Sequence, residues 1–230
     1  MEKDLQKNPS RRRFLEIAAA GALAGLTAQV EIAGPPAALA QSSISPDQAI
    51  EELMAGNRRF TSGALTAHQH DLAILKQKTI EKQEPFAGLL SCADSRVPVE
   101  LLFDQSIGHI FVTRIAGNIV TSEIMASLEY GAVVLGTKAI LVMGHANCGA
   151  VKATIQGKAV PGQISALYPH IQPAVERAGT NLEAATKANA HIQAALLRES
   201  SPVLAGLIKE GKLKVAASYY DIATGKVTLL

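Results

Sequence analysis

The chain has 230 residues, of which 48% are apolar and 18% are charged, a composition that suits one compact core. Its formal net charge is only +2, and no cluster mixes basic with aromatic side chains, so the sequence excludes a surface for nucleic acid. With no tryptophan and few other aromatic residues, the core is expected to be largely aliphatic.

Residues 1 to 40 have the order of features found in a secretory signal. Three arginines, Arg11 to Arg13, precede an apolar run from Ile17 to Val30, and a small-residue site ends at Ala40. Paired arginines before Phe-Leu resemble the bacterial twin-arginine type, so we expect export to the periplasm with cleavage before Gln41. The apolar run is short for crossing a bilayer, so no stable membrane anchor is expected. A basic tail and an uncleaved anchor are the alternatives.

A helix is expected at the start of the mature chain. The run from Ser45 to Gln48 offers an N-cap, a proline at the first helical position and a capping box. Gly56 and Asn57 are expected to end this helix. The polar segment 60–83 has little to bury alone, so we expect this arm to pack on the domain or on a partner subunit.

Short apolar runs alternate with helical patterns in the rest of the chain. Runs rich in Ile, Leu and Val are typical of strands buried on both faces of a parallel sheet. We therefore expect an α/β fold, with a central, mostly parallel sheet flanked by helices, in a single domain of residues 41 to 230. The expected strands are 86–90, 110–113, 139–143, 214–220 and 226–230, and the expected helices are 122–135, 149–155, 182–197 and 202–210.

Both cysteines of the chain lie beside another potential metal ligand. Cys92 stands two residues before Asp94, and His145 stands three before Cys148, in each case after an expected strand. Open α/β sheets place ligands at the carboxyl ends of their parallel strands, and Cys, His and Asp are ligands of tetrahedral Zn²⁺. The pattern indicates a zinc site. A disulfide between the two cysteines and a pair of free buried thiols are the alternatives.

The motif C-x-D-x-R at Cys92 and, about fifty residues later, the motif H-x-x-C at His145 resemble the zinc-site motifs of the β-class carbonic anhydrases. The resemblance extends over most of the chain after the leader. It implies one zinc ion per subunit, held by Cys92, His145 and Cys148, with Asp94 and Arg96 as the catalytic dyad.

In that family the substrate pocket is shared across a dimer interface. By resemblance, Gln83, Phe111 and Tyr130 line the pocket for CO₂ or bicarbonate, and the N-terminal helical arm packs on a twofold partner. We therefore expect a homodimer or a larger assembly of dimers. One branch of the family carries a tryptophan where this chain has Leu89, which favours the plant-like branch with an open zinc site.

The reaction that the resemblance implies is the reversible hydration of CO₂ to bicarbonate and a proton. A zinc-bound hydroxide would attack CO₂, and Asp94, paired with Arg96, would orient the hydroxide. Two alternatives remain open. Asp94 could be the fourth ligand of a closed zinc site in a non-enzymatic protein. A cysteine-nucleophile hydrolase could use His145 as its base, but one cysteine would then have no role.

Overall fold

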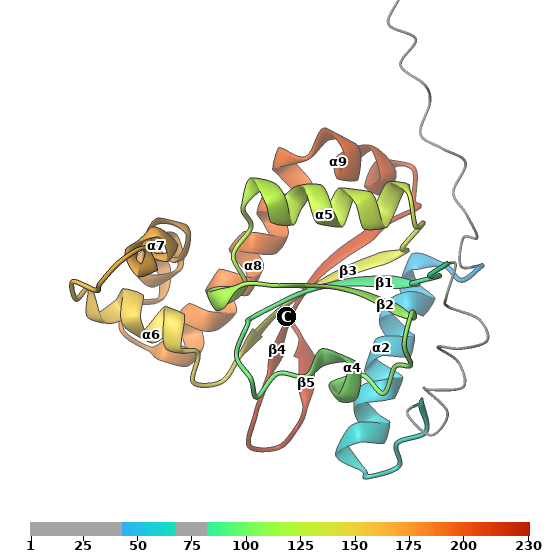
Figure 1. The fold of residues 1–230 in the computed structure, drawn as a ribbon, viewed down its shortest axis with the longest axis horizontal. Coiled ribbons are helices and arrows are strands. Elements are labelled where there is room, and N and C mark those ends of the chain that lie inside the picture. The colour runs from blue at the N-terminus through green and yellow to red at the C-terminus, as the bar shows by residue number, and fades with distance from the viewer. Residues whose placement is uncertain (1–42, 68–81) are drawn as a thin grey trace, which may run out of the picture. The chain divides into compact units, whose positions relative to one another are not determined.

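The computed structural model describes residues 43–67 and 82–230, which include a five-stranded sheet (Figure 1). The strands are β1 (Ala87–Ser91), β2 (Ile110–Arg114), β3 (Ala139–His145), β4 (Lys214–Tyr220) and β5 (Val227–Leu229). Their order is β2-β1-β3-β4-β5, with the first four parallel and β5 antiparallel to β4. The expected α/β class and the mostly parallel sheet are confirmed.

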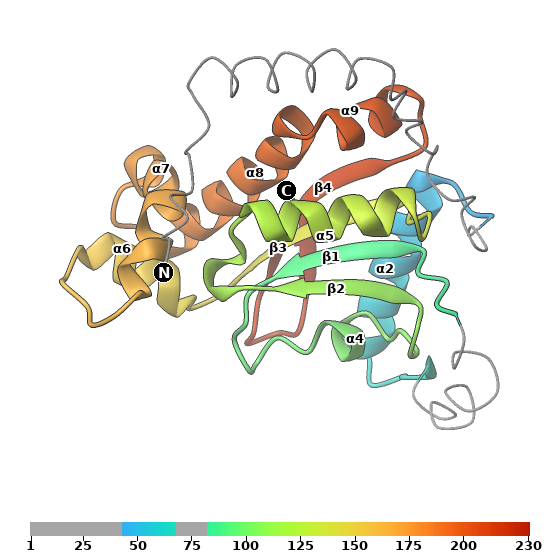
Figure 2. The ribbon, with the colours of Figure 1, turned by 45° about the horizontal axis from the view of Figure 1, so that its top comes forward.

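Helices pack on both faces of this sheet (Figure 2). Successive strand residues point to opposite faces, so Leu89 and Leu141 pack with the helices that begin at Pro46 and Val99, whereas Leu90 and Val142 pack with those that begin at Ser122, Leu182 and Pro202. Burial on both faces explains the continuous apolar runs of these strands. The helices are α2 (Pro46–Thr61), α4 (Val99–Leu102), α5 (Ser122–Val133), α6 (Gly149–Gln156), α7 (Tyr168–Ala178), α8 (Leu182–Ser200) and α9 (Pro202–Lys209), with 3-10 turns η3 (Ala116–Asn118) and η4 (Ile164–Leu167).

The start of α2 is confirmed: the Ser45 hydroxyl accepts from the Gln48 amide, and the Gln48 side chain accepts from the Ser45 amide. Its predicted end at Gly56 and Asn57 is wrong, because the helix continues to Thr61. At Gly56 the backbone of Phe103 approaches so closely that an added Cβ would lie 1.7 Å from the Phe103 carbonyl oxygen. The Asn57 side chain bonds three distant backbone groups, the carbonyls of Leu102 and Gly225 and the amide of Val227.

Several predictions made from the sequence fall outside the described residues. These are the twin-arginine leader, the cleavage site before Gln41 and residues 68–81 of the arm. None of the described helices is both long and apolar enough to cross a bilayer. Helices α4 and α7 were not expected, whereas α5, α6, α8 and α9 lie where the patterns predicted them.

Asp104, in the loop that follows α4, bonds residues at and just after the end of α2. Its buried carboxylate accepts hydrogen bonds from the amides of Thr66 and Ala67, at 3.0 and 2.9 Å, and from the Thr66 hydroxyl, and it pairs with Arg59. Burial alone would raise the pKa of this carboxyl, but the Ala67 amide and the Arg59 guanidinium outweigh burial and lower the pKa to about 2.

This lowered pKa predicts how stability depends on pH. The folded state gains stability from ionised Asp104 above its unfolded pKa near 3.8, and that gain is lost as the pH falls towards about 2. An Asp104→Asn variant should therefore unfold at a lower urea concentration than the wild type at neutral pH. Its free energy of unfolding should be lower by on the order of 2 kcal/mol. The difference should shrink in urea titrations below about pH 4. An equal difference at neutral and acid pH would contradict this account.

Candidate metal centre

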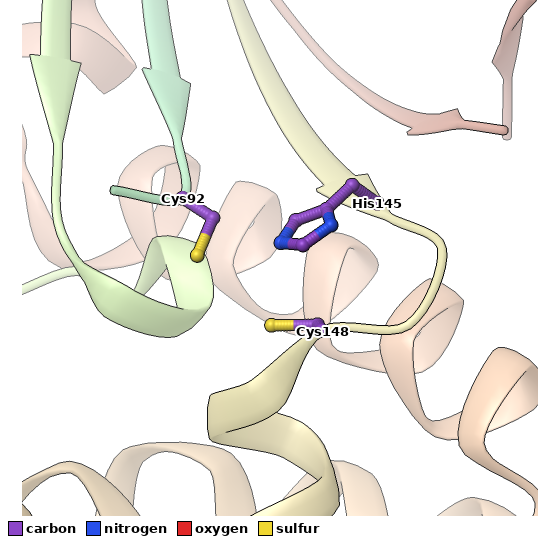
Figure 3. A group of neighbouring side chains, drawn as sticks. All are labelled: Cys92, His145 and Cys148. Atoms are coloured by element: carbon purple, nitrogen blue, oxygen red, sulfur yellow. The ribbon is translucent and has the colours of Figure 1, made fainter. Parts of the chain in front are cut away.

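Three potential ligands meet at the carboxyl edge of the sheet. Cys92 follows β1, His145 is the last residue of β3, and Cys148 is the N-cap of α6. Strands β1 and β3 are adjacent, with Ser91 in register with Met143, so the first two ligands must lie close together. The two sulfurs and one imidazole nitrogen lie within 4.8 Å of one another and face a common point (Figure 3). The structure thus brings together the three predicted ligands.

The state of His145 fits a metal ligand. Its Nδ1 lies 2.9 Å from the carbonyl oxygen of Ala146, so Nδ1 carries the proton and Nε2 keeps its lone pair. Nε2 is buried and has no hydrogen-bond partner among the described residues. A buried nitrogen without a partner is costly, and a metal ion between this nitrogen and the two sulfurs would satisfy it.

The two thiols, both free, also fit a divalent cation. Hydrogen bonding from the Cys148 thiol lowers the pKa of Cys92 against the opposing effect of burial, and the Gly117 amide acts in the same direction. The same interaction with Cys92, together with burial, raises the pKa of Cys148. Ionisation of Cys92 thus disfavours ionisation of Cys148. A divalent cation would remove this conflict, because it stabilises both thiolates at once.

Asp94 and Arg96 form a paired group beside these ligands. The carboxylate accepts from the Arg96 amide and Nε, both at 2.9 Å, and from its terminal nitrogen at 2.7 Å. The Arg96 guanidinium holds the pKa of Asp94 well below its usual range, so the carboxylate stays ionised. One Asp94 oxygen lies 3.9 Å from His145 Nε2, yet the carboxylate is not among the three converging ligand atoms.

Arg114 is a residue of this site that the sequence analysis did not identify. It ends β2, and its guanidinium donates to the carbonyl oxygens of Cys92 at 3.1 Å and of Asp94 at 2.6 Å. These bonds fix the backbone of the turn that carries both side chains. An arginine at the carboxyl end of the neighbouring parallel strand is the pattern that could have indicated this contact.

The three predicted pocket residues do not join the ligands within one chain. Phe111 is in register with Gly88, four residues before Cys92, which separates it from the ligands by about 13 Å along the strands. Tyr130 on α5 contacts Phe111, with ring centroids 6.2 Å apart, and is 48% exposed. Gln83 is exposed and precedes the amino end of β1. All three lie towards the opposite end of the strands from the ligands.

Comparison with known proteins identifies the family. A family model described as "Carbonic anhydrase" matches residues 87–227, which include all three ligands. The chain belongs to the carbonic anhydrase family. Its relatives include the carbonic anhydrase of Mycolicibacterium smegmatis, 31% identical in an alignment of 193 positions that covers 80% of this chain and 93% of the relative.

Solved structures place this carbonic anhydrase in the β class. The structure of the β-carbonic anhydrase CcaA is similar with a TM-score of 0.62 and 25% identity, over 79% of this chain and 87% of that one. The Coccomyxa β-carbonic anhydrase, solved in complex with acetazolamide, has a TM-score of 0.60 and 27% identity, over 79% and 86% of the two chains. The class indicated by the two sequence motifs is therefore confirmed.

Proposed function

We propose that this β-class carbonic anhydrase catalyses the reversible hydration of CO₂ to bicarbonate and a proton at one zinc ion per subunit. Cys92, His145 and Cys148 would hold the ion. The observation that carries the proposal is the meeting of two buried thiols with an imidazole nitrogen that has no hydrogen-bond partner in the described part of the chain. When bound, zinc lowers the pKa of water, so that hydroxide becomes available as a nucleophile near neutral pH.

Asp94 supplies the orienting group in this proposal. As a carboxylate it only accepts hydrogen bonds, and three donors from Arg96 fix its plane. The oxygen nearest to His145 Nε2 can accept a further bond from a nucleophile at the site. Because Arg96 engages Asp94, we infer an open site, in which no fourth side chain from residues 43–67 or 82–230 completes the ligand set. The closed-site and hydrolase alternatives are not favoured.

We further propose that a second copy of the chain completes the substrate pocket. Strand β2 is an edge of the sheet. If two copies of the chain place their β2 edges together across a twofold axis, the two β2 strands run antiparallel. The amino end of one β2 then lies beside the carboxyl end of the other. That arrangement would bring Gln83, Phe111 and Tyr130 of one subunit towards the ligands of its partner. A homodimer, or a larger assembly of dimers, is therefore proposed.

Mixing two defective variants tests this shared pocket. A Cys148→Ser subunit lacks a ligand, and a subunit with Gln83→Ala and Tyr130→Ala lacks two exposed pocket side chains. If the pocket is shared, a mixed dimer has one intact site, so unfolding and refolding an equimolar mixture should restore about a quarter of wild-type activity. If each chain builds its own pocket, both sites of the mixed dimer are defective. Activity no higher than the mean of the two variants would then contradict the proposal.

Export through the twin-arginine route remains part of the proposed function. Two reduced thiols must take up zinc before the chain meets an oxidising compartment, and a route that carries folded proteins would allow this. Replacing Arg11, Arg12 and Arg13 by lysine should trap active precursor in the cytoplasm, as fractionation with an antibody to the mature domain would show. Unaltered accumulation of the triple-lysine variant in the periplasm would refute this route.

A further inference from the structure

The backbone amide of Gly117 contacts one of the three ligands. Its N–H lies 3.3 Å from the sulfur of Cys92, in a buried position. Gly117 has φ +76°, and an added Cβ would lie 2.7 Å from the Cδ1 atom of Ile171. Glycine adopts this positive φ most readily, and a side chain here would also displace Ile171, so Gly117 suits the η3 turn that brings its amide to the sulfur. A hydrogen bond to a thiolate withdraws charge from the sulfur.

Asn189, from the middle of α8, holds Gly117 in place. Its side-chain nitrogen donates to the carbonyl oxygen of Gly117 at 2.8 Å, across 72 positions of sequence. Asn189 is fully buried, so water does not compete for this bond. Asn189 thus fixes the carbonyl that follows the Gly117 Cα, while the N–H that precedes this Cα bonds the sulfur, so Gly117 is held on both sides.

The orientation of the Asn189 amide is set by Gln193, one helical turn further along α8. The oxygen of Gln193 accepts from the Val120 amide at 2.8 Å, and its nitrogen donates to the His170 carbonyl at 3.0 Å. These two backbone groups fix which end of Gln193 is the donor. The donor also reaches the Asn189 oxygen at 3.2 Å, which leaves the Asn189 nitrogen to face Gly117.

We propose that Asn189, oriented by Gln193, is a positioning residue that keeps the Gly117 amide on the Cys92 sulfur and so limits the charge that this sulfur donates to a bound metal. The inference rests on the proposed metal centre. The side chains of Asn189 and Gln193 are both buried, and each of these two amides uses both its donor and its acceptor. Such a network holds one geometry, which a ligand-positioning device requires.

Cobalt substitution provides a test that does not depend on activity. Cobalt(II) bound by thiolates absorbs in the near ultraviolet through sulfur-to-metal charge transfer, and this band moves to longer wavelength when the sulfur loses a hydrogen bond. In Asn189→Leu we expect the charge-transfer band to lie at longer wavelength than in the wild type, with one cobalt still bound per subunit. The Gly117 amide should also exchange its hydrogen faster, by about tenfold or more. Thr186→Val is the matched control, because Thr186 is equally buried on α8 but bonds only within its own helix.

The possible outcomes separate this inference from the proposed metal centre. A folded Asn189→Leu protein that binds cobalt with an unshifted band would overturn the inference, and so would an equal shift in Thr186→Val. Should Asn189→Leu fail to fold, the test uses Gln193→Met, which removes the group that orients Asn189. Its charge-transfer band should also lie at longer wavelength than in the wild type, and an unshifted band would overturn the inference. Wild-type protein that binds no cobalt or zinc would refute the metal centre itself, and this inference with it.

Discussion

In an Arg96→Ala variant, the kcat/KM for CO₂ hydration should fall by roughly two to four orders of magnitude, while zinc stays bound. The substitution removes two of the three hydrogen bonds that hold Asp94, those from the guanidinium. Asp94 then loses its fixed orientation, and its oxygen, already 3.9 Å from His145 Nε2, can turn towards the ligand atoms. Stopped-flow hydration kinetics and metal analysis on the same preparation would measure both effects.

Arg177→Ala is a suitable control for Arg96→Ala, because Arg177 is exposed in the last turn of α7, a helix that carries none of the three ligand residues. It should retain wild-type kinetics. The proposed role of the dyad would be wrong if Arg96→Ala kept near wild-type hydration at both neutral and alkaline pH. Loss of zinc from Asp94→Asn as complete as from a cysteine variant would instead make Asp94 an obligatory ligand, and the closed-site alternative would replace the open one.

The second large effect is expected for Cys148→Ser. A serine hydroxyl is a poor substitute for a thiolate ligand, and the site has only two sulfurs, so most zinc and all measurable hydration activity should be lost. Cys148 is fully buried at the start of α6, and the substitution is nearly isosteric, so the fold should persist. Metal content after dialysis, hydration rate and circular dichroism would together measure this.

Thr154→Val provides the control within the same helix. Thr154 is buried on α6 and its hydroxyl bonds only to the carbonyl of Ala150, so this variant should keep both zinc and activity. Full zinc occupancy with retained activity in Cys148→Ser would rule out the proposed ligand set.

The sequence was sufficient to predict that these potential ligands lie together, because their positions follow from local patterns, whereas the choice of Cys92, His145 and Cys148 without Asp94 came from the family resemblance. Continuous apolar runs before Cys92 and His145 identify buried parallel strands, and the carboxyl ends of adjacent parallel strands meet at one edge. The spacing of His145 and Cys148 then places the second sulfur within the turn between β3 and α6. These features need only the periodicity of a few residues on either side.

Features that depend on contacts between distant segments were missed. Gly56 and Asn57 resemble a helix end, but they lie inside α2, where the approach of Phe103 excludes a Cβ and Asn57 bonds backbone groups up to 170 positions away. The role of Arg114 depends on the pairing of β1 with β2, and that of Asn189 on the docking of α8 beside the η3 turn. For Arg114 its place at the carboxyl end of an expected strand could have indicated the contact, whereas no local pattern indicates the contacts of Gly56, Asn57 or Asn189.

The most direct measurement compares CO₂ hydration before and after removal of the metal. Protein stripped of metal by a chelator, under reducing conditions that keep Cys92 and Cys148 as thiols, should hydrate CO₂ no faster than buffer. One equivalent of zinc per subunit should restore the full rate, with no further gain from a second equivalent. Undiminished hydration by the metal-free protein, or a fully zinc-loaded protein that does not hydrate CO₂, would contradict the account.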